Sequence, residues 1–330
     1  MPSEQPQRID LPGVVAAAAA MSAVGGAVAV SGHLDGHAVL TTQAVRYALA
    51  AGLLAAWAAA TRTAIVRPTR RELCWLFLLA ATGMTGFNVA LVAASAHADP
   101  AVTGVFVGSA PLVIVAIAPP MTGSRPRPGV VAAAVVVVVG AAVVEGTGHA
   151  DGTGLAISAA ALGCEVCFTL CALPVLRRLG PLSLSVHACW IAAIQLLVLG
   201  VVREDVVGGL AALDAAALAA AAYLAVAVTA VAFVLWYTAV GRLGPATASL
   251  FNGIVPLSAA IVGWATLGVA PGPATFLGVA IVGGGVALGL RSSRGPEVTA
   301  PTGAPPPESR PVPAPSAGGG LSPRPAAPSR

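Results

Sequence analysis

Lysine is absent from this chain of 330 residues, and all 17 of its basic side chains are arginines. The lysine that contacts phosphate in the Gly-x-x-x-x-Gly-Lys loop of ATP-driven proteins therefore has no counterpart here, which excludes that class of motor. Charged residues make up only 9% of the chain, against about 25% in soluble domains. So few charges cannot cover a soluble globule, and a net charge of +4 does not favour nucleic acid as a partner.

Long apolar runs take the place of the missing charges. Hydrophobic residues make up 57% of the chain, and its mean hydropathy is +0.88. A helix needs about 20 apolar residues to cross a membrane, whereas strands would alternate in polarity. Ten runs meet the helical requirement: 13–32, 40–60, 73–94, 100–121, 129–144, 153–176, 183–202, 214–240, 245–267 and 272–290. The sequence predicts an all-α integral membrane protein with ten transmembrane helices.

The stretch Asp99–Glu145 recurs without a gap 145 residues further along the chain. Chance matching of alanine and valine would not align its glycines and prolines. The aligned pairs are Pro100 with Pro245, Phe106 with Phe251, Gly108 with Gly253, Pro111 with Pro256, Gly123 with Gly268, Pro126 with Pro271, Pro128 with Pro273, and Gly140 with Gly285. Five spans separate the copies, so they cross the membrane in opposite directions. We therefore predict two inverted five-helix repeats, which are typical of secondary transporters.

Arginines gather in alternate connections between the predicted spans. Positively charged flanks resist translocation and stay in the cytoplasm. One face would carry Arg8, Arg62, Arg67, Arg70, Arg71, Arg125, Arg127, Arg177, Arg178, Arg242, Arg291, Arg294, Arg310, Arg324 and Arg330. The opposite face would carry His33, Asp35, His37, His97, Asp99, His149, Asp151, Glu204, Asp205 and Asp214, with Arg203 as its one cation. We predict a multi-pass protein of the cytoplasmic membrane with both termini in the cytoplasm.

The composition changes at both ends of the apolar region. Residues 1–12 form a short cytoplasmic leader, and the first span is expected to remain as an anchor because nine more follow. The first repeat covers 13–146 and the second covers 153–291, each with five spans. From 292 to 330, proline, glycine, serine and alanine dominate, and such a segment buries too little apolar surface to fold. We expect a disordered cytoplasmic tail there, either simply solvated or serving as a proline-rich docking ligand.

The cysteines and outer-loop histidines are poor candidates for a metal site. Three cysteines share one face of the sixth predicted span, yet no histidine accompanies them. A thiol inside a span behaves as a small apolar residue. His33, Asp35 and His37 lie close together in the first outer loop, where titratable residues are ordinary. We therefore predict neither a metal nor a cofactor.

Motifs in both halves resemble one known family. In the first half they are Arg46-Tyr47, Gly83-Met84-Thr85-Gly86, Asp99-Pro100 and Ala110-Pro111-Leu112. In the second half they are Leu235-Trp236-Tyr237-Thr238-Ala239-Val240, Arg242-Leu243-Gly244-Pro245-Ala246, Val255-Pro256-Leu257 and the glycine-rich run from Gly278 to Gly289. Their order and spacing over about residues 13–290 resemble the EamA-type transporters of the drug/metabolite transporter superfamily.

This resemblance implies a ten-helix carrier that usually exports small metabolites, such as amino acids or drugs, across the cytoplasmic membrane. The chain departs from the family at one point. Members usually carry a Gly-Glu pair after the fourth and ninth spans, whereas this chain has Gly123-Ser124 and Gly268-Val269. Any role of those glutamates in gating or assembly does not carry over to this chain.

Two residues, Glu165 and Arg46, carry the cost of a charge within the membrane, about 2.5–3.5 kcal/mol at a helix centre on insertion scales. Glu165 lies roughly 18 Å along the sixth span, near the membrane midplane. It either exchanges protons during transport, or is protonated and bonded to a neighbour, or marks a shifted helix boundary. Arg46 lies roughly 9 Å inside the second span and either anchors it at the interface or contacts a substrate carboxylate. A pair between them requires facing helix rotations that the sequence does not specify.

Neutral polar side chains can complete a solute cavity at low desolvation cost. Asn88 and Asn252 are the first candidates, and the rings of Trp236 and Tyr237 suit an amphipathic solute. Gln43, Thr85 and Ser109 form a second group. Hydrogen bonding or packing between helices is the alternative role for each of them.

Proline inside a span removes a backbone hydrogen bond and leaves a carbonyl that can line a cavity. Pro111 and Pro256 fall about 11–12 residues into the fourth and ninth spans. We therefore expect helix kinks at equivalent depths, which suit rocking of one repeat against the other. Trp57, Trp75 and Trp264 lie near span ends and are expected at the membrane interface.

Together these features predict a secondary transporter that exports a small organic solute, amino acid-like or a drug, by alternating access. Glu165 would respond to protons. The partners would be the solute and membrane lipid, and the protein would act as a monomer or a homodimer. A lipid flippase or a membrane enzyme is one alternative, although an enzyme needs clustered His, Asp or Glu at a membrane face. A non-transporting scaffold that acts through the proline-rich tail is the other.

Overall fold

The structure is a computed structural model that describes residues 10–31, 38–268 and 270–293. Within these ranges the chain is helical, and its one β-bridge joins Ala98 to Ala150. The leader before Asp10, the loop residues His33, Asp35 and His37, and the tail after Ser293 lie outside the described residues.

The helices follow the predicted spans in order. In the first half they are α1 (Leu11–Ser31), α2 (Val39–Ala60), α3 (Arg70–Leu79) with the π-helix η2 (Ala80–Gly86) and α4 (Phe87–Ala94), α5 (Pro100–Gly108) with α6 (Ala110–Thr122), and α7 (Pro128–Glu145). In the second half they are α8 (Gly152–Leu170), α9 (Leu173–Arg203), the short α10 (Val206–Ala211), α11 (Ala215–Tyr223) with the π-helix η3 (Leu224–Val231) and α12 (Ala232–Leu243), α13 (Pro245–Ser249) with the 3-10 helix η4 (Leu250–Gly253) and α14 (Ile254–Leu267), and α15 (Pro273–Ser292).

Nine helical stretches of the described chain are long and apolar enough to cross a membrane. The remaining predicted span, 13–32, corresponds to α1, a helix of 21 residues. The prediction of an all-α multi-pass membrane fold is confirmed, with ten as an approximate count of the spans.

The boundary between the sixth and seventh spans differs from the prediction. The sequence predicts one helix over 153–176, but α8 ends at Leu170 and a short helical piece begins at Leu173. Gly180 has a φ of 72°, which breaks α9 before Pro181. Only glycine adopts this left-handed backbone readily, so the chain turns there and the long seventh span follows.

The fourth and ninth spans are interrupted at equivalent places. α5 ends at Gly108 and α6 begins at Ala110, so Pro111 lies in the first turn of α6. In the second copy η4 precedes Ile254, and Pro256 lies in the first turn of α14. Proline suits a first turn because the N–H that it lacks would have no partner there. The break therefore lies just before each proline instead of at it.

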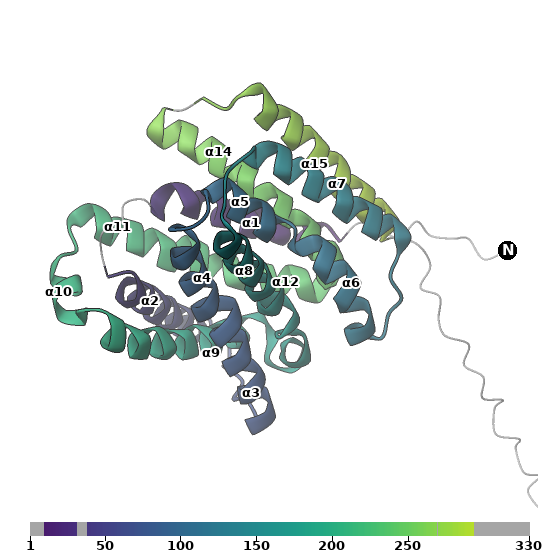
Figure 1. Cartoon of the computed structure of the whole chain (residues 1–330). Coiled ribbons are helices and arrows are strands. Elements are labelled where there is room, and N and C mark those ends of the chain that lie inside the picture. The colour runs from purple at the N-terminus through teal and green to yellow at the C-terminus, as the bar shows by residue number, and fades with distance from the viewer. Residues whose placement is uncertain (1–9, 32–37, 269, 294–330) are drawn as a thin grey trace, which may run out of the picture. The chain divides into compact units, whose positions relative to one another are not determined.

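The last helices of the two repeats, α7 and α15, lie side by side (Figure 1). A Cβ atom added to Gly278 would lie 2.7 Å from the carbonyl oxygen of Gly140. One added to Gly140 would lie 2.9 Å from the carbonyl oxygen of Gly278. Small residues let helices approach closely inside a membrane, where packing replaces the hydrophobic effect as the driving force. These two glycines therefore let α7 and α15 approach each other closely.

Charged residues of the predicted arginine-rich face contact each other. Arg178 forms an ion pair with Glu72, which caps α3. Arg242 at the end of α12 donates to Asp10 before α1, with a shortest distance of 2.8 Å. This hydrogen bonding to Arg242 holds the pKa of the Asp10 carboxyl below its ordinary value. Connections that the sequence assigns to one face are thus neighbours in space.

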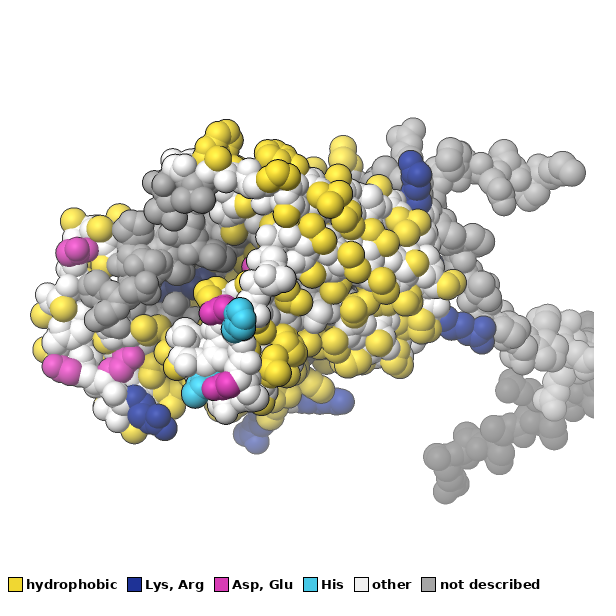
Figure 2. Space-filling model, turned by 45° about the horizontal axis from the view of Figure 1, so that its top comes forward, with side chains coloured by type: hydrophobic (Ala, Val, Ile, Leu, Met, Phe, Trp, Pro, Cys, Tyr) yellow, Lys and Arg dark blue, Asp and Glu magenta, His cyan; other side chains and the backbone are white. Residues whose placement is uncertain are grey.

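The predicted opposite face has its own contacts. The carboxylate of Glu204, after α9, accepts hydrogen bonds from the backbone N–H groups of Leu40 and Thr41, each at 2.9 Å. It thereby closes the N-terminal end of α2, where free N–H groups attract negative charge. In Figure 2 the Asp, Glu and His side chains lie in the left half of the view, whereas arginines lie at the right and along the lower edge, with one at the lower left. A surface rich in hydrophobic side chains lies between them, as a membrane protein requires.

Gly278→Ala should lower thermal stability, because the new methyl group would collide with Gly140 and with Val144. Overpacking of this kind costs about 1–3 kcal/mol. The matched control is Gly284→Ala on the same helix, since a Cβ there meets no atom within 4 Å. Unfolding of the detergent-purified variants on heating measures the difference. Equal unfolding midpoints for the two variants would contradict the close contact between α7 and α15.

Candidate functional site

A polar centre lies where α8 meets the interruption of the ninth span. Glu165 lies inside α8, and the Nδ2 atom of Asn252 in η4 donates to its Oε1 atom at 3.4 Å. Glu165 is half-buried and Asn252 is buried. Asn252 occupies the 3-10 turn just before α14. The interruption of the ninth span therefore carries the amide that contacts the carboxyl group.

Two buried polar atoms close to this pair have no hydrogen-bond partner among the described residues. They are Oδ1 of Asn252 and Oγ1 of Thr169, which lies one helical turn after Glu165. Buried polar atoms in proteins are almost always bonded, so these two are available to a solute or to water. An amide donates through its nitrogen and accepts through its oxygen. Asn252 can therefore serve Glu165 as a carboxylate or as a carboxylic acid.

Four aromatic rings form a contiguous group, the aromatic cluster, made of Tyr47, Phe168, Phe233 and Tyr237. The ring centre of Phe168 lies 4.9 Å from that of Phe233 and 5.3 Å from that of Tyr237. Tyr47 lies 6.4 Å from Phe233. The Tyr237 hydroxyl also donates to the Phe168 carbonyl at 3.3 Å. The aromatic cluster connects α2, α8 and α12, and it reaches within one helical turn of Glu165.

Arg46 lies beside this cluster on α2. Its guanidinium carbon is 5.2 Å from the ring centre of Tyr47. Its Nε atom donates to Thr229 Oγ1 at 2.7 Å, and its NH1 atom donates to Gln43 Oε1 at 3.1 Å. No carboxylate pairs with Arg46 among the described residues. A half-buried guanidinium is thus held by neutral acceptors, and its positive charge is left without a counter-ion.

The pair between Arg46 and Glu165 that the sequence left open does not form. Arg46 bonds to Thr229 and Gln43, whereas Glu165 bonds to Asn252. The two ionisable groups therefore mark separate positions, on α2 and α8, and the aromatic cluster includes residues from both helices.

Most of the other polar candidates form hydrogen bonds within the protein. Asn88 is buried and donates from Nδ2 to the Met84 carbonyl at 2.7 Å and to the Tyr47 hydroxyl at 3.2 Å. Thr85 donates to the side chain of Gln195, and Ser109 donates to the carbonyl of Phe106. These contacts favour a structural role in helix packing, and not one in a solute cavity, for Asn88, Thr85 and Ser109.

The tryptophans differ in their surroundings. Trp236 is buried, and its Nε1 atom has no partner among the described residues. Trp57 and Trp264 are exposed on the outside of the bundle, where an interfacial anchor belongs. Trp75 is half-buried and packs against the main core instead.

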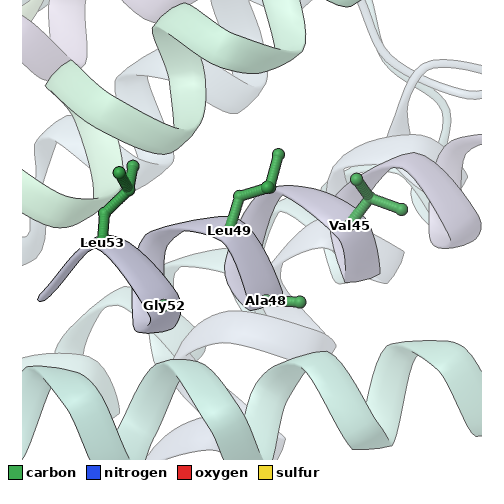
Figure 3. A pocket seen from close by; sticks show the side chains of 5 residues that line it. All are labelled: Val45, Ala48, Leu49, Gly52 and Leu53. Carbon is green, nitrogen blue, oxygen red and sulfur yellow. The ribbon is translucent and has the colours of Figure 1, made fainter. Parts of the chain in front are cut away.

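An open groove of about 430 Å³ follows α2, lined by Val45, Ala48, Leu49, Gly52 and Leu53. Figure 3 shows the side chains of Val45, Leu49 and Leu53 along one side of the helix. This lining contains no polar side chain, so it cannot orient a charged solute. The polar centre at Glu165 is therefore the better candidate site. Among the described residues, no group of three or more His, Cys, Asp and Glu is arranged to hold a metal ion.

Spans repeated with inverted topology, and ionisable groups held at a half-buried centre, define a multi-pass α-helical membrane transporter. The chain belongs to the EamA-like transporter family, whose model matches residues 11–145 and 154–291. The family suggested by the sequence motifs is thus confirmed.

Two known proteins extend this comparison. A "Probable terminal-alkyne amino-acid exporter" of Streptantibioticus cattleyicolor is 32% identical over 271 residues, which cover 79% of this chain and 87% of that protein. A solved structure described as "Crystal structure of protein" superposes with a TM-score of 0.74 at 18% identity, over 86% of this chain and 97% of that chain. The first likeness supports the family, and the second shows the fold alone.

Sequence reasoning missed Phe168 and Phe233 as members of the site. A signal was present, because Phe233 and Tyr237 are four residues apart and share one face of a helix. Phe168 likewise lies three residues after Glu165. Which face of each helix turns inward depends on packing across the bundle, and the sequence does not state it.

Asn88→Ala should destabilise the protein by about 1–3 kcal/mol, because it leaves buried partners without their hydrogen bonds. The matched control is Thr82→Ala in the adjoining π-helix η2, since the Thr82 hydroxyl donates to the Leu78 carbonyl one turn earlier and the residue is only half-buried. Thermal unfolding in detergent measures both. An Asn88→Ala variant as stable as the Thr82→Ala variant would argue against the structural role in helix packing.

Proposed function

We propose that this protein is a secondary transporter that exports an amino acid-like solute by proton-coupled alternating access. The carrying observation is Glu165, a half-buried carboxyl deep inside α8 with a single neutral partner, in a chain of a transporter family. A charge within the membrane is costly, so ionisable residues there usually have a partner or serve a function. The name of the curated exporter supports an amino acid as the solute class.

The proposed proton cycle uses both polar atoms of the Asn252 side-chain amide, Nδ2 as a donor and Oδ1 as an acceptor. When the carrier faces the cytoplasm, binding of a solute ammonium group displaces the proton of Glu165. The carboxylate then pairs with the ammonium and accepts from Asn252 Nδ2. After release outside, Glu165 takes a proton again and donates it in a hydrogen bond to Asn252 Oδ1, which has no other partner among the described residues. One proton therefore enters for each solute that leaves.

Arg46 supplies the second contact. An amino acid carries a carboxylate as well as an ammonium group, and Arg46 has a positive charge without a carboxylate partner among the described residues. Guanidinium and carboxylate form strong charge-assisted hydrogen bonds. The aromatic cluster then offers an apolar surface for a hydrophobic solute side chain. Tyr237 belongs to this surface, and the neighbouring Trp236 offers a free N–H.

The packing of the two interrupted spans supports alternating access. On the predicted cytoplasmic side α6 packs against α13. Val115 of α6 and Leu250 of η4, which follows α13, are buried in one apolar cluster. Inverted symmetry relates this pair to α5 and α14 on the other side, and these two helices do not pack against each other to a similar extent. The breaks before Pro111 and Pro256 lie between the packed and unpacked halves. We assign this arrangement to a state that is closed towards the cytoplasm.

Membrane orientation completes the proposal. The arginine-rich connections would lie in the cytoplasm with both termini, in the cell membrane. The repeats would extend over 13–146 and 153–291, between a leader at 1–12 and a disordered tail at 292–330. A full set of two repeats can work as a monomer or within a homodimer.

Glu165→Gln should abolish proton release when an amino acid binds, because glutamine carries no exchangeable acid proton. Purified protein in weakly buffered detergent solution is mixed with a panel of amino acids and cationic drugs while pH is recorded. The matched control is Glu145→Gln, which removes a half-buried carboxyl that forms no hydrogen bond or ion pair among the described residues. Proton release that persists in Glu165→Gln, or binding of drugs alone, would overturn the proposal.

Arg46→Gln should weaken binding of free amino acids by about 10- to 100-fold, since a hydrogen bond to a charged group contributes about 1.5–3 kcal/mol. Methyl esters of the same amino acids lack the carboxylate and should bind both proteins equally. The control is Arg203→Gln, which removes a cation from the end of α9. Equal losses for acids and esters would show that Arg46 only holds the fold.

A further inference from the structure

Two connections carry the same tripeptide. Residues 97–99 follow the third span and residues 149–151 precede the sixth, and both read His-Ala-Asp. They pair antiparallel through a bridge between Ala98 and Ala150. The two segments exchange backbone hydrogen bonds of 2.9 and 3.1 Å. The bridge thus joins a connection within the first repeat to the entry of the second.

A side-chain contact reinforces this bridge. His97 Nδ1 lies 3.0 Å from Asp151 Oδ2, and Asp151 Oδ1 accepts from the Gly154 N–H at 2.7 Å, which caps α8. The Gly154 N–H and then His97 hold the pKa of the Asp151 carboxyl below its ordinary value. It therefore remains a carboxylate at any pH that cells meet. We name His97, Asp151 and Gly154 the outer clasp.

The same arrangement recurs at the opposite face. Asp10 accepts from the Gly13 N–H at 3.3 Å and thereby caps α1, while Arg242 donates to Asp10 at 2.8 Å. Arg242 lies 145 residues after His97, which is the offset of the sequence repeat. A glycine follows the aspartate by three residues in both places. Arg242, Asp10 and Gly13 form the inner clasp, the inverted counterpart of the outer clasp.

Each clasp joins one repeat to the other. The outer clasp ties the start of α8 to the connection between α4 and α5, and the inner clasp ties the start of α1 to the end of α12. A buried hydrogen bond of 3.0 Å between Thr103 and Ser158 continues the outer contact between α5 and α8. Because α8 carries Glu165, the outer clasp holds the helix of the proposed proton site.

The clasps differ in one chemical respect. Arginine keeps its charge at every accessible pH, whereas a histidine side chain gains its positive charge only below about pH 6.5. From this difference we infer that the outer clasp is a pH-dependent contact that holds the start of α8, the helix of Glu165. His97 would then be a positioning residue for transport. When the imidazole is protonated, His97 and Asp151 form an ion pair; when it is neutral, only a hydrogen bond joins them. The inner clasp contains no histidine and does not change in this way.

Few other titratable groups surround His97. Asp99 and His149 lie on the bridge, and Glu145 ends α7. α4 and α5 carry none, and Glu165 is the only acidic group within α8. His149 Nδ1 lies 3.8 Å from Asp99 and its side chain is fully exposed. His149→Gln is therefore a matched control on the same bridge.

The consequence for transport rests on the proposed function, but the clasp itself can be tested without a substrate. Thermal unfolding of the detergent-purified chain is measured at pH 5.5 and 7.5 for His97→Gln, Asp151→Asn and the double variant. The coupling between the two substitutions should be larger at pH 5.5. The coupling between Arg242→Gln and Asp10→Asn should be the same at both pH values. A coupling of His97 to Asp151 that is absent, or independent of pH, would overturn the inference.

Transport supplies the second readout. Cells loaded with the exported amino acid are moved to media between pH 5 and 8, and the efflux of each variant is divided by that of wild type. His97→Arg should remove a pH-dependent component of about two- to fivefold, the size expected for an exposed ion pair. His149→Gln should retain it, and Arg242→His should not introduce it from outside. If wild type exports no amino acid, the proposed function fails while the unfolding result still decides the clasp.

Discussion

The hydrocarbon core of a membrane offers no water, so every polar group that enters it needs a partner within the protein. This constraint explains why the described chain is almost entirely helical and why its interruptions are confined to particular places. The fourth span breaks before Pro111, and the ninth breaks before Pro256. At the second break, Asn252 turns an irregular backbone into a contact for Glu165. The interruption of the helix at this break therefore brings a polar side chain into contact with Glu165.

The same constraint applies to the two ionisable residues, Arg46 and Glu165, which each need a partner within the protein. A direct ion pair between Arg46 and Glu165 would neutralise both and leave nothing for a solute. The structure instead gives each a neutral partner, Thr229 and Asn252. Such partners satisfy individual donors and acceptors while they leave the net charge uncompensated. In the proposed function, a zwitterionic solute would pair its two charges with these two groups, beside the aromatic cluster.

Inverted repetition provides two faces of similar geometry, and single residues then make them chemically different. Paired glycines bring α7 and α15, the last helices of the two repeats, into close contact. The clasps at Asp10 and Asp151 are symmetric in their capping geometry, yet one pairs with arginine and the other with histidine. In the proposed orientation the histidine lies on the outer face and the arginine on the cytoplasmic face.

The features that depend on single segments of the chain could be predicted from the sequence. Apolar runs of sufficient length determined the spans, the repeated proline and glycine pattern determined the inverted repeat, and the rarity of charge singled out Glu165 and Arg46. The end of the sixth span at Leu170 was missed, because the apolar run continues into the short helical piece that begins at Leu173. Only the tertiary structure decided which groups meet. Asn252 is 87 residues from Glu165, and Thr229 is 183 residues from Arg46. Their contacts depend on the rotation of each helix about its axis, and this rotation is set by packing against neighbouring helices. It therefore cannot be read from the apolar residues of a single span.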